Sequence, residues 1–289
     1  KFTSKKPHYE YLRKKWTARH RSVQNKFWEK HGQSLKTVAL GSLGGLMLIF
    51  SPSNAKFPSP NLIASRDDAI LDYDPNVLLA KTLSDKLPQE VRPLDAGEEK
   101  EIADTLSRNY GFKVTAEINN IRLERNYGLI GGEQHLYRYP GDTLLSHAQT
   151  SSDWAMYGSA GIAPGLGAWG YFAPSKSEFR EIDEQRERYY LAIQTFLVPG
   201  YAENVSEFRD FFRFRKMIVV NPRSGQAVVA VIGDAGPATW TGKHLGGSPE
   251  VMYIVGLAGG PRRGPVLYFF VDDPEDKIPL GPIKVKGQA

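Results

Sequence analysis

Two short β-branched runs, residues 217–220 and 227–232, constrain the fold of this chain more than any other feature. Both are rich in Val, Ile and Ala, and the residues between them contain Asn-Pro and Ser-Gly pairs, which favour a turn. The pattern predicts a β-hairpin. The second run ends in Gly-Asp-Ala-Gly-Pro at residues 233–237, where glycine lets the backbone bend and a loop exposes the carboxyl group of Asp234. We therefore expect a functional site at this end of the strand.

The composition favours a turn-rich β protein with its own core. The 289 residues include 28 Gly and 19 Pro, and 41% of the chain is hydrophobic. The chain contains no Cys, which excludes disulfides, thiolate metal sites and cysteine nucleophiles. The net charge of +5 arises in the first 36 residues, which hold eleven Lys or Arg and two Glu, so the rest is mildly acidic. We expect no nucleic-acid partner, since the remaining sequence has no basic footprint.

The N-terminal part has the features of an export signal. An uncharged, mostly apolar run at residues 37–50 follows the basic stretch, and Ser53-Asn54-Ala55 offers small residues to a signal peptidase. We expect a basic cytoplasmic tail at residues 1–34 and a cleaved signal peptide or signal-anchor helix at residues 35–55, with a buried core helix as the alternative. The rest of the protein is then extracytoplasmic, in the cell envelope, and either membrane-anchored or secreted.

A proline-rich spacer, residues 56–94, separates this segment from the first folded unit and contains a possible short helix at residues 76–86. A second helix is predicted to begin at Asp95, which forms a capping box with Glu98.

Strands are predicted at residues 112–118 and 121–125, joined by an Asn-Asn turn. With the helix that begins at Asp95 they make a small α+β unit, residues 95–150. His135 and His147 lie in this unit, and both a packed histidine and a ligand or acid/base role remain open for each.

A Gly-x-Gly-x-x-Gly pattern at residues 165–170 does not qualify as a dinucleotide site, because proline precedes it and no helix pattern follows. We therefore expect no cofactor, and no metal motif is recognised. Residues 168–172 are predicted to form a first barrel strand, residues 176–188 a charged helix and residues 189–198 a further strand. Residues 199–207 are predicted to be a surface insertion.

The region 217–271 resembles the double-psi β-barrel shared by the rare lipoprotein A family and the expansins. The matching residues are Asn221-Pro222, Ser224-Gly225, the strand 227–232, Asp-Ala-Gly-Pro at 234–237, Gly242-Lys243, Ser248 and, upstream, Gly170-Tyr171. The resemblance implies a mainly β chain with a six-stranded double-psi β-barrel at residues 151–275. The small α+β unit and the N-terminal hydrophobic helix would precede the barrel, and a tail at residues 276–289 would follow it.

The resemblance also implies a site. Barrels of this family hold a polysaccharide chain in a shallow groove, and their acid falls on Asp234. The family's histidine aligns with Gln194 and its second aspartate with Gly246. The candidate substitutes are His244, or Glu178 and Asp183 ahead of the predicted strand. Asp234 is therefore the candidate catalytic residue, or alternatively a cap of its own turn.

Aromatic residues near the matched motifs are Trp169, Tyr171 and Trp240. We expect them to stack on sugar rings together with Gln194 and His244 as substrate-binding residues, or alternatively to pack in the barrel.

Three functions follow from these expectations. The leading one is binding, and possible remodelling at Asp234, of peptidoglycan or another wall polysaccharide. The second is an active lytic transglycosylase that cleaves glycan strands with Asp234 as acid/base. The third is a non-catalytic, structural or protein-binding barrel, which an insertion that plugs the groove would favour.

Overall fold

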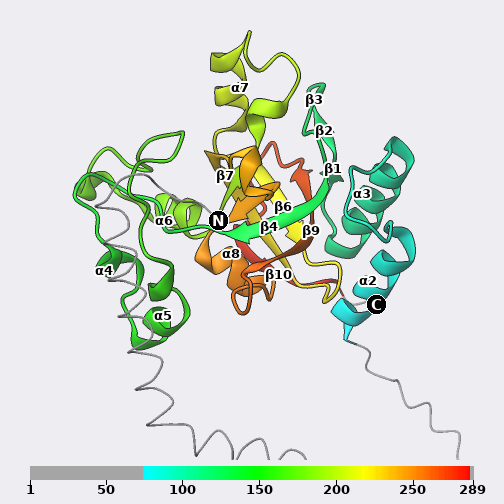
Figure 1. Cartoon of the computed structure of the whole chain (residues 1–289), viewed down its shortest axis with the longest axis horizontal. Helices are drawn as coiled ribbons and strands as arrows, with labels where there is room; N and C mark the ends of the chain where they lie inside the picture. The colour runs from blue at the N-terminus through cyan, green and yellow to red at the C-terminus, as the bar shows by residue number, and fades with distance from the viewer. Residues whose placement is uncertain (1–73, 287–289) are drawn as a thin grey trace, which may run out of the picture. The chain divides into compact units, whose positions relative to one another are not determined.

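The computed structural model describes residues 74–286 (Figure 1). The predicted basic tail at residues 1–34, the signal segment and the first part of the proline-rich spacer, residues 56–73, lie outside these residues. Within residues 74–286, each helix is too short or too polar to span a membrane.

Six strands close into a mixed β-barrel, so the expectation of a mainly β chain with a C-terminal six-stranded barrel is confirmed. Around the barrel the order is β4, β8, β5, β7, β6 and β9, and β9 pairs back to β4. The β4–β8 and β5–β7 pairs are parallel and the other pairs are antiparallel. The strands are β4 (Tyr127–Gly132), β5 (Tyr190–Ile193), β6 (Lys216–Val220), β7 (Ala227–Ala235), β8 (Leu245–Gly247) and β9 (Arg263–Val271).

The predicted hairpin is confirmed as β6 and β7, which pair from Lys216–Val231 to Val220–Ala227. At the turn, the backbone N–H groups of Gly225 and Ser224 both donate to the carbonyl oxygen of Asn221. Gly225 has a φ of 71°, a left-handed conformation that glycine adopts without steric cost.

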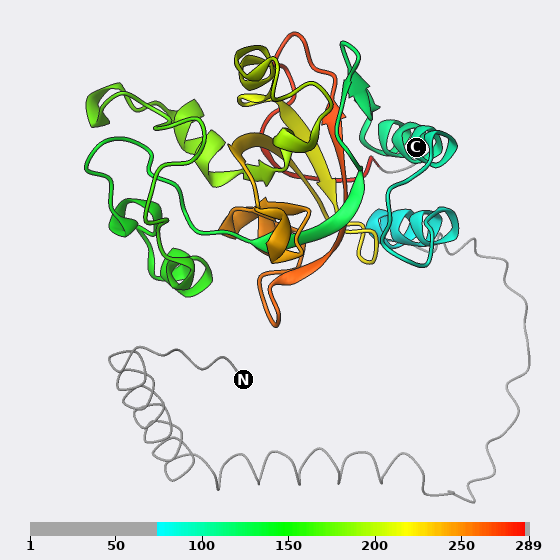
Figure 2. The same ribbon diagram turned by 45° about the horizontal axis from the view of Figure 1, so that its top comes forward.

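The strands of this hairpin are buried on both faces because side chains alternate along them. Met217 and Val219 point into the barrel core, whereas Ile218 and Val220 pack against helices outside it. Those helices are α2 (Pro75–Lys86) and α3 (Ala96–Tyr110), which lie side by side on one side of the barrel in both views (Figures 1 and 2). Burial on both faces explains why the strands read as unbroken apolar runs.

The predicted helix and Asn-Asn turn of the α+β unit are present, whereas the predicted strand at 112–118 is split into two short strands and the one at 121–125 ends at Arg122. Both hydrogen bonds of the capping box between Asp95 and Glu98 start α3 as expected. Asn119 and Asn120 both have positive φ and join β2 (Glu117–Ile118) to β3 (Ile121–Arg122). The short strand β1 (Val114–Thr115) pairs with β9 and so extends the barrel sheet. At the other end of the sheet β10 (Gly281–Ile283) pairs with β7.

The first barrel strand is β4, so the prediction of a strand at residues 168–172 is wrong. Those residues belong to a long connection between β4 and β5 that lies on the other side of the barrel from α2 and α3 (Figures 1 and 2). The connection contains α4 (Leu144–His147), α5 (Ser151–Met156) and α6 (Glu181–Arg188), with 3₁₀ turns at Gly158–Ala160 and Lys176–Glu178. The predicted helix at 176–188 is thus split, and the predicted strand 189–198 ends at Ile193.

Residues 199–207 are exposed except for a half-buried Tyr201, as expected of an insertion, but helix α7 (Val205–Phe212) begins within them. The remaining helical elements are α8 (Pro249–Ile254) and two 3₁₀ turns, Thr195–Leu197 and Thr239–Thr241.

Candidate functional site

Four of the predicted site residues meet at one end of the barrel because of its strand directions. Strands β5 and β7 run parallel, with Ala192 beside Asp234, so both end at the same rim. Strand β8 starts there too, since Leu245 pairs with Ile193. This rim, with Gln194, Asp234, Trp240 and His244, is called the Asp234 end below.

Asp234 is half-buried and holds its two carboxyl oxygens in different surroundings. Its Oδ1 accepts hydrogen bonds from the backbone N–H of Ala168 at 2.6 Å and of Ala235 at 2.8 Å. No described residue donates to Oδ2, and this oxygen is not among the buried unpartnered atoms. Burial raises the pKa of Asp234 above its ordinary value, although the two amides act in the opposite direction. The residue therefore caps its turn and also presents a free oxygen.

The aromatic residues differ in exposure. Trp169 is 5% exposed and belongs to the barrel core, and its Nε1–H donates to the carbonyl oxygen of Ile232 at 3.1 Å. Tyr171 is half-buried in the loop that follows. Trp240 is 87% exposed on the β7–β8 loop. Of the three, Trp240 presents the most surface to a ligand.

Gln194 and His244 hold the loops of this end in place. The side-chain Nε2 of Gln194 donates to the carbonyl oxygens of Pro237 at 2.9 Å and Lys243 at 3.2 Å, at the two ends of the loop that carries Trp240. His244 Nδ1 accepts from the backbone N–H of Leu129 at 2.9 Å.

His244 Nε2 lies 3.0 Å from Nη1 of Arg125. Burial and then the charge of Arg125 lower the pKa of His244. Gln194, His244 and Arg125 are among the residues that line a cavity of about 10 Å³, which is room for roughly one water molecule. Sequence reasoning missed Arg125, which no motif marks.

Gly246, which aligns with the family's second aspartate, has no room for a side chain. A Cβ atom there would overlap the side chain of Glu133, whose Oε1 pairs with Nζ of Lys243 at 2.9 Å. With this ion pair in place, residue 246 accommodates glycine and offers no second acid.

Part of the Asp234 end is covered by the segment that contains α7. Phe212 is fully buried in the barrel core, and Phe211 and Phe208 pack against the same core. The segment enters β6 beside the last part of β7, where the backbone N–H of Phe214 donates to the carbonyl oxygen of Ile232. Figure 1 shows α7 beyond the barrel at the end labelled β7.

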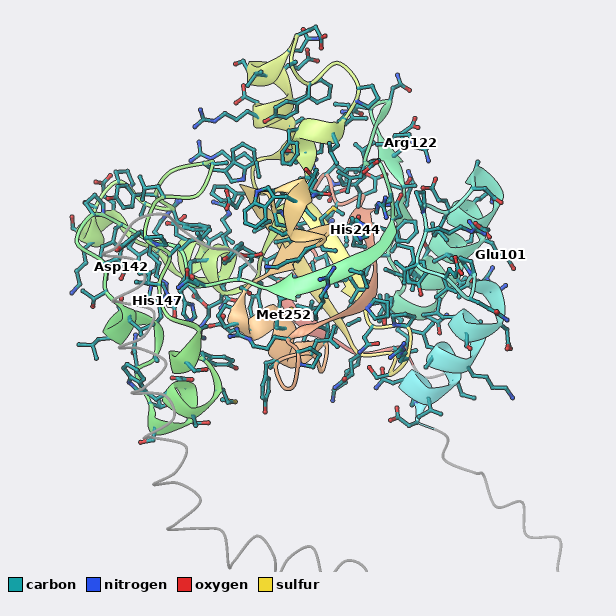
Figure 3. The ribbon with its side chains drawn as sticks, viewed as in Figure 1. Glu101, Arg122, Asp142, His147, His244 and Met252 are labelled. Carbon is teal, nitrogen blue, oxygen red and sulfur yellow. The ribbon has the colours of Figure 1, made fainter. Side chains whose placement is uncertain are left out.

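A second group of polar residues is buried outside the barrel, in the β4–β5 connection. We call it the polar cluster: His135, Arg138, Asp142, His147 and Glu187, each at most 5% exposed. Figure 3 shows Asp142 and His147 together in this connection, away from His244 in the barrel.

Glu187 on α6 is the centre of the polar cluster. Its Oε2 lies 2.9 Å from Nε of Arg138 and 3.1 Å from Nδ1 of His147, and its Oε1 lies 3.4 Å from Nδ1 of His135. Burial alone would raise the pKa of Glu187, but the two histidines and Arg138 hold it well below the ordinary value.

On the far side of its ring, His147 Nε2 lies 2.8 Å from Oδ2 of Asp142. Burial alone would lower the pKa of His147, but its bonds to Asp142 and Glu187 raise it. The two histidine rings are 4.6 Å apart between centroids. Two imidazoles and a carboxylate in such proximity are a set that can hold a metal ion. Sequence reasoning had noted both histidines and left their role open.

Near the polar cluster, Glu250 on α8 is 3% exposed and neither of its carboxyl oxygens has a partner among the described residues. Burial and then the charge of Glu187 raise its pKa to about 8.

Comparisons with protein-family models, curated proteins and solved structures found no match to this chain. Functional inference therefore depends on the residues and their geometry.

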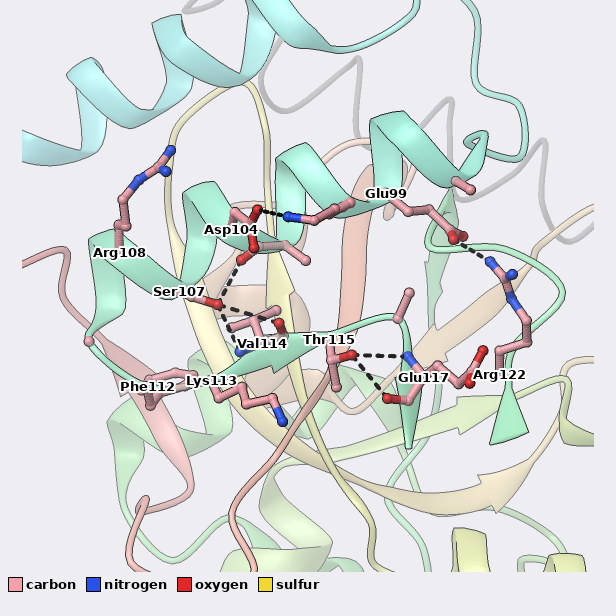
Figure 4. Close-up of a pocket in the computed structure, with 15 residues that line it drawn as sticks. Glu99, Asp104, Ser107, Arg108, Phe112, Lys113, Val114, Thr115, Glu117 and Arg122 are labelled. Carbon is pink, nitrogen blue, oxygen red and sulfur yellow. Dashed lines mark hydrogen bonds and ion pairs between the residues drawn. The ribbon is translucent and has the colours of Figure 1, made fainter. Parts of the chain in front are cut away.

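A cavity of about 730 Å³ lies away from both groups, between α3 and strands β1 to β3 (Figure 4). Most of the charged side chains that line this cavity form ion pairs with one another. Arg122 pairs with Glu99, and Lys100 pairs with Asp104 at 2.6 Å. None of the predicted site residues lines it.

Proposed function

We propose that the barrel is of the double-psi type and that it binds a wall polysaccharide, with peptidoglycan as the first candidate, at the Asp234 end. A closed barrel of six strands with two parallel pairs supports the fold assignment. The matched Asp-Ala-Gly-Pro motif begins at the end of β7, where a loop site is expected. The proposal includes the predicted export of the chain, through a signal or anchor at residues 35–55.

The observation that carries the proposal is that Asp234, near the end of β7, and the exposed Trp240, on the β7–β8 loop, both lie at the Asp234 end. The free Oδ2 of Asp234 can accept hydrogen bonds from sugar hydroxyl groups. The indole of Trp240 offers a broad apolar face for a sugar ring. Because Gln194 fixes both ends of the loop, little conformational entropy is lost when a ligand binds.

Glycan cleavage is the second candidate function, and one observation favours it. The raised pKa of Asp234 keeps more of the acid protonated at a given pH, as proton donation to a glycosidic oxygen requires. A glycosidase that uses water normally needs a second carboxylate. Neither Gln194 nor Gly246 supplies one, so cleavage through Asp234 would need the sugar's own hydroxyl group as nucleophile.

The packing of α7 onto the barrel core favours a third reading, a structural or protein-binding barrel without a sugar ligand. This reading predicts that the full chain does not bind purified sacculi.

The test is co-sedimentation of the full chain with purified sacculi, with release of anhydro-muropeptides measured in the same samples. We expect wild type to bind, and Trp240→Ala to weaken binding by about tenfold, since loss of an exposed aromatic contact costs about 1–2 kcal/mol. Trp154→Ala is the matched control, because Trp154 on α5 is also exposed, at 43%, but lies outside the Asp234 end.

Asp234→Asn separates binding from cleavage. The amide keeps an oxygen for the two backbone N–H donors but loses the acid, so bound protein is expected with no product release. Absence of wild-type binding, or an equal loss in Trp240→Ala and Trp154→Ala, would contradict the sugar-binding proposal.

A further inference from the structure

The polar cluster brings together side chains from distant positions. His135 follows β4, His147 ends α4, and Glu187 lies in the last turn of α6. All three side chains are 0% exposed. One nitrogen of each histidine and one oxygen of Glu187 lie within 4.8 Å of one another.

The spacing of these atoms matches the coordination shell of a transition metal. With metal–ligand bonds of about 2.0–2.2 Å, neighbouring ligands of a tetrahedral ion lie about 3.4 Å apart. Nδ1 of His135 lies 3.4 Å from Oε1 of Glu187, and Nδ1 of His147 lies 3.1 Å from Oε2. The groups are thus already at ligand separation.

The surroundings also match a metal site. Oδ2 of Asp142 lies 2.8 Å from the remote nitrogen of His147, which is how an outer carboxylate usually orients a metal-bound histidine. Asp142 is itself held by the backbone N–H of Arg138 at 2.9 Å. Nε of Arg138 lies 2.9 Å from Oε2 of Glu187, and the backbone N–H of Leu136 donates to Oε1 at 3.1 Å, so the protein fixes the orientation of this carboxylate.

Two features show that the interior of the β4–β5 connection needs further stabilisation. Its own apolar cluster contains just three buried residues among those described, Leu136, Phe172 and Tyr190. In addition, His135 Nε2 and Arg138 Nη2 are buried without a hydrogen-bond partner. Small units with little apolar core commonly depend on a bound metal.

We infer that His135, His147 and Glu187 bind a divalent transition metal ion, with Zn²⁺ as the best match, in a buried structural site. Two imidazoles and a carboxylate suit Zn²⁺ better than Mg²⁺ or Ca²⁺, which prefer oxygen ligands. The ion joins the start of the connection to α6 and therefore fixes the connection to the barrel. The three ligand side chains have no solvent access, which assigns the ion to stability and not to catalysis.

The test uses the full chain without a histidine tag, purified without chelator. Elemental analysis is expected to give one zinc ion per chain. Removal of the ion with a chelator is expected to lower Tm, and Zn²⁺ at about one hundred times its Kd to raise it again by about 5–10 °C. Reconstitution with Co²⁺ is expected to give the visible absorption bands of a tetrahedral nitrogen- and oxygen-bound ion.

The variant His147→Asn is expected to lose the metal, whereas His244→Asn, the other described histidine, is expected to retain it. If His147→Asn does not fold, the Co²⁺ spectrum and the number of imidazole ligands in X-ray absorption of wild type decide the question. The inference is overturned if purified wild type carries no stoichiometric metal and Tm is unchanged with Zn²⁺, Co²⁺, Ni²⁺, Mn²⁺ and Fe²⁺. Retention of the metal by a folded His147→Asn variant also overturns it.

Discussion

Glu250 gives the sharpest test of how the buried charges affect stability. Its carboxyl group is 3% exposed, has no partner among the described residues and lies within the field of Glu187, so its pKa rises from 4.5 to about 8. Arg188 and Arg138 act in the opposite direction but do not outweigh these effects. The native protein therefore keeps this proton at a pH where the unfolded chain has released it.

The direction in which the free energy of unfolding changes with pH follows from the difference between the native and the unfolded pKa of Glu250. Because the native pKa is raised, the stabilising contribution is complete below pH 4.5 and is lost as the pH rises through about 8. At about 1.4 kcal/mol for each pH unit, the loss over that window is on the order of 5 kcal/mol. Glu250→Gln removes the titrating group while it keeps the shape, so the free energy of unfolding of the variant is expected to fall much less over the same window.

The assay is urea unfolding at pH 5, 7 and 9 in the presence of a chelator, which keeps any bound metal out of the comparison. Glu181→Gln is the matched control, because Glu181 is exposed on α6, and it is expected to follow wild type. If wild type and Glu250→Gln lose stability in parallel between pH 5 and 9, then Glu250 is not protonated in the native state and the reasoning is wrong.

Two further substitutions test the barrel. Phe212→Ala is expected to lower the free energy of unfolding by about 3–5 kcal/mol, because it leaves a cavity where α7 enters the core. A free energy of unfolding equal to that of wild type would mean that α7 is not anchored there. Gly246→Asp is expected to destabilise the chain by about 2–4 kcal/mol, because the new side chain overlaps that of Glu133; an unchanged Tm would refute this.

The sequence was informative where local chemistry determines structure. The turn between β6 and β7, the capping box at Asp95 and the Asn119-Asn120 turn all depend on residues close in the chain, and all three are present. Gln194, Asp234 and His244 lie at one rim of the barrel because each stands at the end or the start of a strand.

Strand β4 shows where sequence patterns fail. It reads Tyr-Gly-Leu-Ile-Gly-Gly, and glycine normally argues against a strand. The structure gives the reason for two of these glycines: a Cβ at Gly128 would meet His244, and one at Gly131 would meet Lys243. Both neighbours are more than one hundred residues away in the chain, so no local pattern can reveal the requirement.

No local sequence pattern reveals the polar cluster either. The sequence marks His135 and His147 as isolated residues, and Glu187 lies forty residues beyond His147 in the region predicted to be a charged helix. The burial of Glu187 depends on how the earlier residues of the β4–β5 connection pack against α6, and these residues are distant from Glu187 in the sequence.

The side chain of Gln194 has an architectural consequence, since one amide group clamps both ends of the β7–β8 loop. Because both ends are anchored, changes within the stretch from Ala238 to Gly242 are expected to have little effect on the strands on either side. The sequence of this loop, and even its length, can therefore change while the barrel strands keep their structure. New binding surfaces can evolve, or be grafted, in this loop without a change of fold.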